Sequence, residues 1–62
     1  MKTINNLDYP TVKKDGNNIK TEEVEKGDMI IIDKKSYEVL CEPYFSINLL
    51  EGTYEVNIKE MK

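Results

Sequence analysis

The chain has 62 residues, a net charge of −3 and no histidine, and its single cysteine is Cys41. A domain of this length buries only about 60% of the surface that its unfolded chain exposes, so it has one small core and marginal stability. Cys41 has no partner for an internal disulfide, and structural zinc sites of the common Cys/His kinds are excluded. We therefore predict a single domain over residues 1–62, without a metal or cofactor, that is stabilised by packing or by a partner.

The charged residues disfavour nucleic acid as a partner. All nine basic residues are lysines, which lack the rigid fork with which arginine binds phosphate or guanine. The pI is about 4.8, whereas nucleic-acid-binding domains usually carry a basic patch. No apolar run approaches the ~20 residues of a membrane span, the N-terminus lacks the apolar stretch of a signal peptide, and an unpaired cysteine fits a reducing compartment. We expect a protein that does not bind membranes and lies in the cytoplasm of a bacterium or a phage-infected host.

The first part of the chain is predicted to be polar and extended. Residues 1–18 carry only single apolar residues and are expected to form a short strand, an extended arm, or both. Asp15-Gly16-Asn17-Asn18 predicts a turn, because Gly and Asn tolerate positive φ. Residues 19–25 follow as a candidate strand with Ile19 and Val24 facing inward.

A hairpin is predicted in the middle of the sequence. Lys26-Gly27-Asp28 favours a turn, and the apolar run 29–32 suits a strand that is buried on both faces. The polar residues 33–36 connect this run to a second strand over residues 36–42. The side chains that share one face of that second strand are Tyr37, Val39 and Cys41.

Two further strands are predicted beyond Pro43, which cannot occupy a central ladder position. Residues 44–50 are expected to place Phe45, Ile47 and Leu49 on one face, and Glu51-Gly52 to form a turn. Residues 54–59 alternate most regularly, with Tyr54, Val56 and Ile58 inward. The fold predicted is all-β: a small SH3-like barrel of four to five short antiparallel strands with a polar N-terminal arm. The sheet is expected to curl because a flat sheet of this size leaves exposed edges.

The stretch from Val24 to Val39, VEKGDMIIIDKKSYEV, carries a family resemblance. Its Gly-Asp turn, apolar strand, polar hairpin and Tyr-x-Val are similar to the pattern that opens the SH3-like (KOW-type) barrels at the N-terminus of elongation factor P and its relatives. The resemblance covers about a quarter of the chain. Those factors usually carry glycine where this chain has Lys34-Lys35, and no basic residue follows Val39 at the place of their modified residue. The resemblance therefore implies the barrel and no functional residue.

No residue pattern predicts catalysis. Cys41 lacks a histidine to activate it and has Glu38 and Glu42 near it in sequence, so a buried structural cysteine is the favoured interpretation. The carboxylates between Glu22 and Asp28 do not match the ligand spacing of an EF-hand loop, and they are expected to be solvated. We predict that the protein is not an enzyme and has no catalytic or metal-binding residues.

The aromatic residues are the candidates for partner binding. Tyr44 and Phe45 are adjacent, so a strand sends them to opposite faces and one of them points away from the core. Together with Tyr9 and the acidic Glu42, they are predicted to contact a protein partner. The alternative, in which the N-terminal arm covers the outward aromatic residue, is equally compatible with the sequence. Lys34 and Lys35 are candidate phosphate contacts.

The preferred hypothesis is a non-catalytic protein-binding module, such as a phage or mobile-element accessory or inhibitor protein that acts by occlusion or bridging. One alternative is an RNA- or ribosome-associated barrel of the translation-factor type, based on the resemblance and the paired lysines. Another is a structural subunit of a homo-oligomer that presents a sheet edge such as residues 54–59.

Overall fold

A computed structural model describes residues 2–48 and 51–61, and in it the protein is all-β, as predicted. Its strands are antiparallel, and one turn of 3₁₀ helix interrupts them. In chain order the elements are β1 (Lys2–Asn5), β2 (Thr11–Lys14), β3 (Asn17–Lys20), η1 (Thr21–Glu23), β4 (Met29–Ile32), β5 (Lys35–Val39), β6 (Tyr44–Asn48) and β7 (Glu51–Glu60). No helix within the described ranges is long and apolar enough to cross a membrane.

Two tight turns set the register of the first two hairpins. Asp15 and Gly16 have φ of 54° and 80°, and they connect Lys14 to its pairing partner Asn17. Asp33 and Lys34 have φ of 51° and 67° in the equivalent connection between β4 and β5. Positive φ at both central residues is the type I′ geometry that matches the twist of hairpin strands. Both predicted turns are therefore confirmed, although the first is two residues long and its asparagines begin β3.

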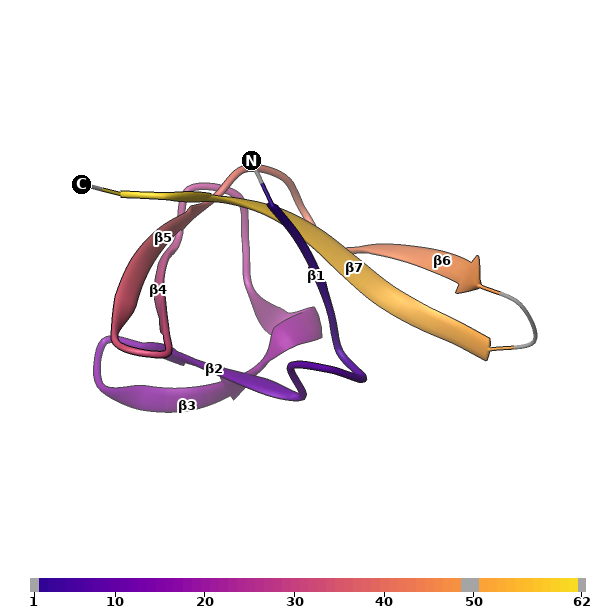
Figure 1. Ribbon diagram of the computed structural model, residues 1–62, viewed down its shortest axis with the longest axis horizontal. Coiled ribbons are helices and arrows are strands. Elements are labelled where there is room, and N and C mark those ends of the chain that lie inside the picture. The colour runs from indigo at the N-terminus through magenta and orange to yellow at the C-terminus, as the bar shows by residue number, and fades with distance from the viewer. Residues whose placement is uncertain (1, 49–50, 62) are drawn as a thin grey trace.

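The sheet is organised around β7 (Figure 1). The strand order is β1-β7-β5-β4-β2-β3, and β6 pairs with β7 outside this path. Ile58 pairs with Lys2 of β1 on one side and with Val39 of β5 on the other. Glu55 pairs with Asn5 of β1 and with Tyr44 of β6. Strands β5 and β6 thus lie along the same edge of β7, one after the other.

The core is small and lies around the middle of the sheet. Ile30, Val56 and Ile58 are completely buried, and Tyr37 is buried as predicted. The hydrophobic residues of this core are Ile4, Val12, Val24, Ile30, Ile32, Tyr37, Val39, Val56 and Ile58. Tyr9, Ile19 and Cys41 pack against it and are partly buried.

Several of the expectations for individual segments are wrong, and the strand predicted over residues 36–42 ends at Val39. Met29 and Ile31 are exposed, because β4 has only one face against the core and alternate residues meet solvent. The strand predicted over residues 19–25 ends at Lys20, and η1 follows it before the buried Val24. Glu51 and Gly52 begin β7 instead of forming a turn. Leu49, which was expected to share a face with Phe45, lies outside the described residues.

The predicted barrel of four to five strands is not confirmed. The described residues form seven strands in a single open sheet, because two-residue turns divide the chain into short segments and the break after Val39 separates β6 from β5. Strands β1 and β3 end the main path of the sheet and do not pair with each other in the described ranges. Residues 1–18, which were expected to form a short strand, an extended arm, or both, form β1, β2 and the start of β3. The molecule is elongated, at 35 × 21 × 18 Å.

Candidate functional site

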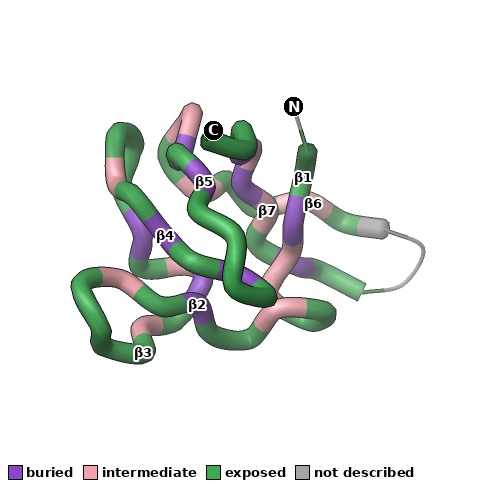
Figure 2. The backbone as a smooth tube through the Cα atoms, turned by 60° about the vertical axis from the view of Figure 1, so that its left-hand side comes forward, coloured by how far each residue is buried: buried purple, intermediate pink, exposed green. Residues whose placement is uncertain are grey.

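The β6–β7 hairpin projects from the rest of the sheet (Figure 1). Val39 pairs with Ile58 and Tyr44 pairs with Glu55, so the four residues between β5 and β6 face two residues of β7. An insertion of this kind is a bulge, which bends the strand and increases its twist. Beyond it the hairpin leaves the core, and most of its surface is exposed or partly exposed (Figure 2).

The bulge is held by Cys41 and Asn57. The backbone N–H of Leu40 donates to the Asn57 carbonyl over 2.8 Å, and the Asn57 N–H donates to the Cys41 sulfur over 3.5 Å. Cys41 is therefore partly buried and tied to β7, which agrees in part with its interpretation as a buried structural residue. Among the residues that the structure describes, no group of three His, Cys, Asp or Glu side chains could hold a metal ion.

Among the described residues of the hairpin, one face carries three exposed apolar side chains, which we call the apolar hairpin face: Phe45, Ile47 and Tyr54. Their exposed fractions are 59%, 69% and 41%. The rings of Phe45 and Tyr54 meet edge to face, with centroids 5.4 Å apart and an interplanar angle of 70°. Gly52 leaves room for this arrangement, since a Cβ there would lie 2.9 Å from Phe45 Cε1 and closer still to Cζ. The ring contact orders Phe45 without burying it.

The opposite face of the hairpin is polar and acidic. Tyr44 lies opposite Glu55 in the register, and the alternation of the strand places Glu51 on the same face. Partial burial and the Glu55 carboxylate raise the pKa of the Tyr44 phenol above its ordinary value of 10.0. Thr53, which pairs with Ser46 midway along the hairpin, is buried on this face, and its Oγ1 has no hydrogen-bond partner in the described ranges.

Negative charge surrounds the hairpin. From residue 36 to residue 58 the sequence contains four acidic residues and no basic one. The four are Glu38, Glu42, Glu51 and Glu55. A charged surface of one sign attracts partners of the other sign and repels polyanions.

The outer edge of β6 is the least protected edge of the sheet. In the described part of the chain, β6 pairs only with β7. The strands that end the main path each contain a lysine, Lys2 in β1 and Lys20 in β3, whereas the residues of β6 carry no charge. Lysine is one of the devices by which proteins prevent the pairing of an edge strand with another chain.

The structure divides the predicted partner-binding residues between separate places. Phe45 lies on the apolar hairpin face, and Tyr44 lies on the opposite face, as strand alternation predicted. Glu42 is exposed just before β6. Tyr9 is half-buried elsewhere, with its hydroxyl 3.5 Å from Lys2 Nζ and its carbonyl accepting a hydrogen bond from the Thr21 hydroxyl. Tyr9 therefore packs against the core and does not join Phe45.

Sequence reasoning missed Ile47 and Tyr54 as members of this surface. Tyr54 was predicted to be core because it alternates with Val56 and Ile58, but Thr53 is buried and Tyr54 is 41% exposed. The register along β7 is uninterrupted, so Tyr54 keeps the face of Val56 and Ile58, but it lies in the part of β7 that pairs with β6. The alternation of Phe45 with Ile47 beside a proline break was the one signal of an exposed apolar strand.

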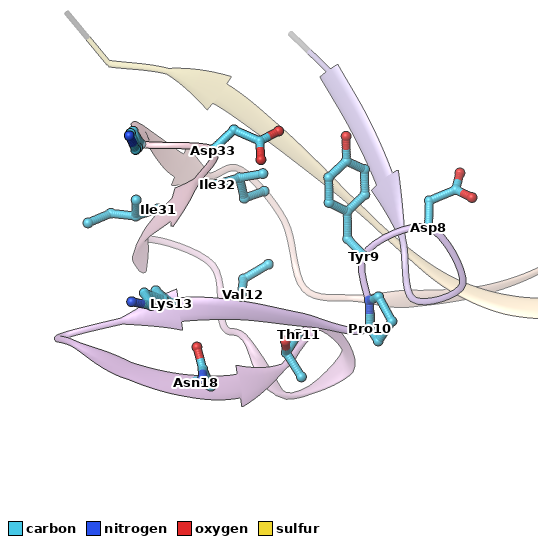
Figure 3. Close-up of a pocket in the computed structure, with 11 residues that line it drawn as sticks. Asp8, Tyr9, Pro10, Thr11, Val12, Lys13, Asn18, Ile31, Ile32 and Asp33 are labelled. Carbon is cyan, nitrogen blue, oxygen red and sulfur yellow. The ribbon is translucent and has the colours of Figure 1, made fainter.

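A separate pocket of about 470 Å³ lies where β2 and β4 diverge (Figure 3). Only one residue pair, Lys13 and Ile31, joins these two strands. Lys13 and Lys34 line the pocket, but so do Asp8 and Asp33, so its lining has no net charge. Lys35, the other candidate phosphate contact, is exposed on β5 outside this lining.

The acidic segment between Glu22 and Asp28 contains one ordered ion pair. Lys14 Nζ lies 3.0 Å from Asp28 Oδ2, which also accepts a hydrogen bond from the Glu25 backbone N–H over 2.9 Å. The Glu25 N–H and, secondly, Lys14 lower the pKa of Asp28, and the hydrogen bond with Asp28 raises the pKa of Lys14. These contacts fix the turn before β4 and give the carboxylate a structural role.

Comparisons with known proteins give no match: no family model matches this chain, nor does any curated protein or solved structure.

Proposed function

We propose that this protein is a non-catalytic protein-binding module and that it binds its partner through the apolar hairpin face. One observation carries the proposal: Phe45, Ile47 and Tyr54 form an exposed apolar cluster on a hairpin that projects from the core. Single exposed apolar residues are ordinary on protein surfaces, but contiguous ones with acidic surroundings are typical of interaction sites. Aromatic residues ordered before binding lose little entropy in a complex, which suits Phe45 and Tyr54 as anchors.

The charges favour a protein partner over RNA at this surface. Phosphate binding needs basic residues, and the sequence has none from residue 36 to residue 58. The RNA- or ribosome-associated alternative relies on Lys34 and Lys35, and Asp8 and Asp33 line the same pocket as Lys34 and offset its charge there. A small acidic module of this kind would act by covering or bridging surfaces of its partner, as a phage or mobile-element accessory or inhibitor protein does.

A homo-oligomer that forms by strand pairing would need an edge other than residues 54–59, which the sequence suggested. Residues 54–59 belong to β7, which has β1 on one side and β5 and β6 on the other. That segment therefore cannot accept a strand from a second copy. In the described ranges, the hairpin strand that has no partner along its whole outer edge is β6.

The test compares captures by matched variants of the immobilised protein from a bacterial lysate. Phe45→Ala combined with Ile47→Ala should abolish the capture of any partner that the unmodified protein retains. Met29→Ala removes an exposed apolar side chain from β4, away from the hairpin, and should leave capture within about twofold. Retention of the partner by the double variant, or an equal loss with Met29→Ala, would contradict the proposal.

A further inference from the structure

We propose that the β6 edge accepts an extended segment of the partner as an additional strand, and that this segment alternates apolar and basic residues. The inference rests on the proposed function, because it specifies how the hairpin would bind and what chemistry its partner carries. Three features of the hairpin lead to it: a free edge, two faces of different chemistry, and a charge of one sign.

The free edge supplies the main-chain contacts. Strand addition uses the unpaired N–H and C=O groups of an edge strand, and it needs an edge without the charges or prolines that block pairing. Strand β6 pairs only with β7 in the described ranges, and its five residues are uncharged. Strands β1 and β3 each carry a lysine, so β6 is the edge best suited to receive a strand.

The two faces set the sequence of the added strand. Its residues would point alternately to the two faces of the sheet. Those on the side of Phe45 and Ile47 would meet apolar side chains with exposed fractions of 59% and 69%. Those on the other side would point toward the face of β7 that carries Glu51 and Glu55. An added strand lies roughly 10 Å from β7, which is within the combined reach of a lysine or arginine and a glutamate.

The sign of the charge distinguishes the partner from a second copy of this chain. A second copy would bring another acidic hairpin against the first, since residues 36–58 contain four glutamates and no lysine. Like charges across neighbouring strands are destabilising, whereas opposite charges stabilise the pair. The hairpin therefore fits a basic, extended segment of a different protein.

The test uses a short synthetic peptide that alternates valine and lysine, and its affinity is measured by NMR titration of the whole protein. A peptide that alternates valine and glutamate is the charge control. Two or three exposed ion pairs correspond to roughly a tenfold difference in affinity. The lysine peptide should bind at least about tenfold more tightly than the glutamate peptide, and its affinity should fall as salt increases. Equal affinities for the two peptides, or no binding of the lysine peptide, would overturn the proposal.

N-methylation separates strand addition from simple contact with the apolar hairpin face. In an extended peptide the N–H groups of all valines point to one edge and those of all lysines to the other. Methylation of one set should abolish binding, while methylation of the other set should leave it within about twofold. If both methylated peptides bind, or neither does, strand addition is contradicted. The proposed function would still stand if capture depends on Phe45 and Ile47.

A variant of the protein completes the test. Ile47→Lys places a charge on the edge strand and should weaken peptide binding about tenfold or more. Ile31→Lys makes the same change at an exposed isoleucine of β4 and should not weaken it. Equal effects of the two variants would contradict the assignment to β6. Dimerisation of the free protein that Ile47→Lys abolishes would also overturn the proposal, because the edge would then belong to a second copy.

Discussion

At the scale of single residues, the bulge and the ring pair determine what the hairpin presents to solvent. The Cys41 sulfur accepts the Asn57 N–H where β5 and β6 are interrupted, so the insertion does not leave that donor unsatisfied. Beyond it, the absence of a side chain at Gly52 lets the Phe45 ring lie across β7 and contact Tyr54. The exposed aromatic residues are thus held in place by local geometry, although they lie outside the core.

Asp28 gives a pH-dependent prediction at this scale. Its pKa is lowered from an ordinary value of 3.8 by the Glu25 N–H and by Lys14, so the folded state favours the charged carboxylate. This contribution to stability is present above the unfolded pKa and is lost as pH falls through the folded pKa. Asp28→Asn should therefore lower the free energy of unfolding at pH 7, and this effect should diminish as the pH falls below the ordinary value of 3.8 and through the lower folded pKa. Urea unfolding at neutral and acidic pH measures this difference.

The asparagine substitution isolates the charge, because its side-chain oxygen can still accept the Glu25 N–H. An equal loss of stability at neutral and acidic pH would show that the carboxylate acts through shape alone and would contradict the ionic account of the turn.

At the scale of elements, β7 has two different roles along its length. Its C-terminal part lies between β1 and β5 and contributes the buried Val56 and Ile58. Its N-terminal part has only β6 beside it up to Thr53, and it carries the exposed Tyr54. The first part holds the core together, and the second presents the apolar hairpin face.

This division predicts opposite outcomes for two isoleucine substitutions. Ile58→Ala removes completely buried atoms from the strand that joins both parts of the sheet, and such changes cost about 2–5 kcal/mol. Ile47→Ala removes atoms that are 69% exposed and should change stability by no more than about 0.5 kcal/mol. Urea unfolding curves of the two variants measure both effects. Comparable losses would contradict the description of the hairpin as independent of the core.

The sequence predicts the elements that depend on local chemistry. Both type I′ turns follow from Asp15-Gly16 and from the polar run after Ile32, and the break between β5 and β6 follows from Pro43. The opposite orientations of Tyr44 and Phe45 follow from strand alternation. The sequence did not determine whether Phe45 is exposed, because that depends on whether another segment covers its side chain.

The features that the sequence did not predict depend on long-range pairing. Met29 and Ile31 are as apolar as Ile30, so only the position of β4 in the sheet shows that one of its faces meets solvent. Tyr54 alternates regularly with Val56, and only its place in the part of β7 that pairs with β6 distinguishes it from the buried residues of that strand. The open sheet likewise depends on which strands pair, which composition and periodicity do not specify.

At the scale of the whole molecule, the protein combines a small core with an exposed acidic extension. Nine of the residues that the structure describes form the hydrophobic core, and a chain with a single cysteine has no internal disulfide to support it. Cores of this size supply only a few kcal/mol of stability, so a bound partner would add appreciably to it. Residues 1–35 have no net charge, because they contain seven lysines and seven acidic residues. The net charge of −3 therefore comes from residues 36–62. The hairpin therefore combines three features: it projects from the core, it lies in the negatively charged part of the sequence, and it exposes apolar side chains.

Amide hydrogen exchange of the protein, alone and with its captured partner, tests the central claim most directly, because it reports which surface becomes protected. The account predicts slower exchange across β6 and the first residues of β7, with little change in β2, β3 and β4. Protection confined to the pocket between β2 and β4, around Lys13 and Lys34, with the hairpin unchanged, would contradict it.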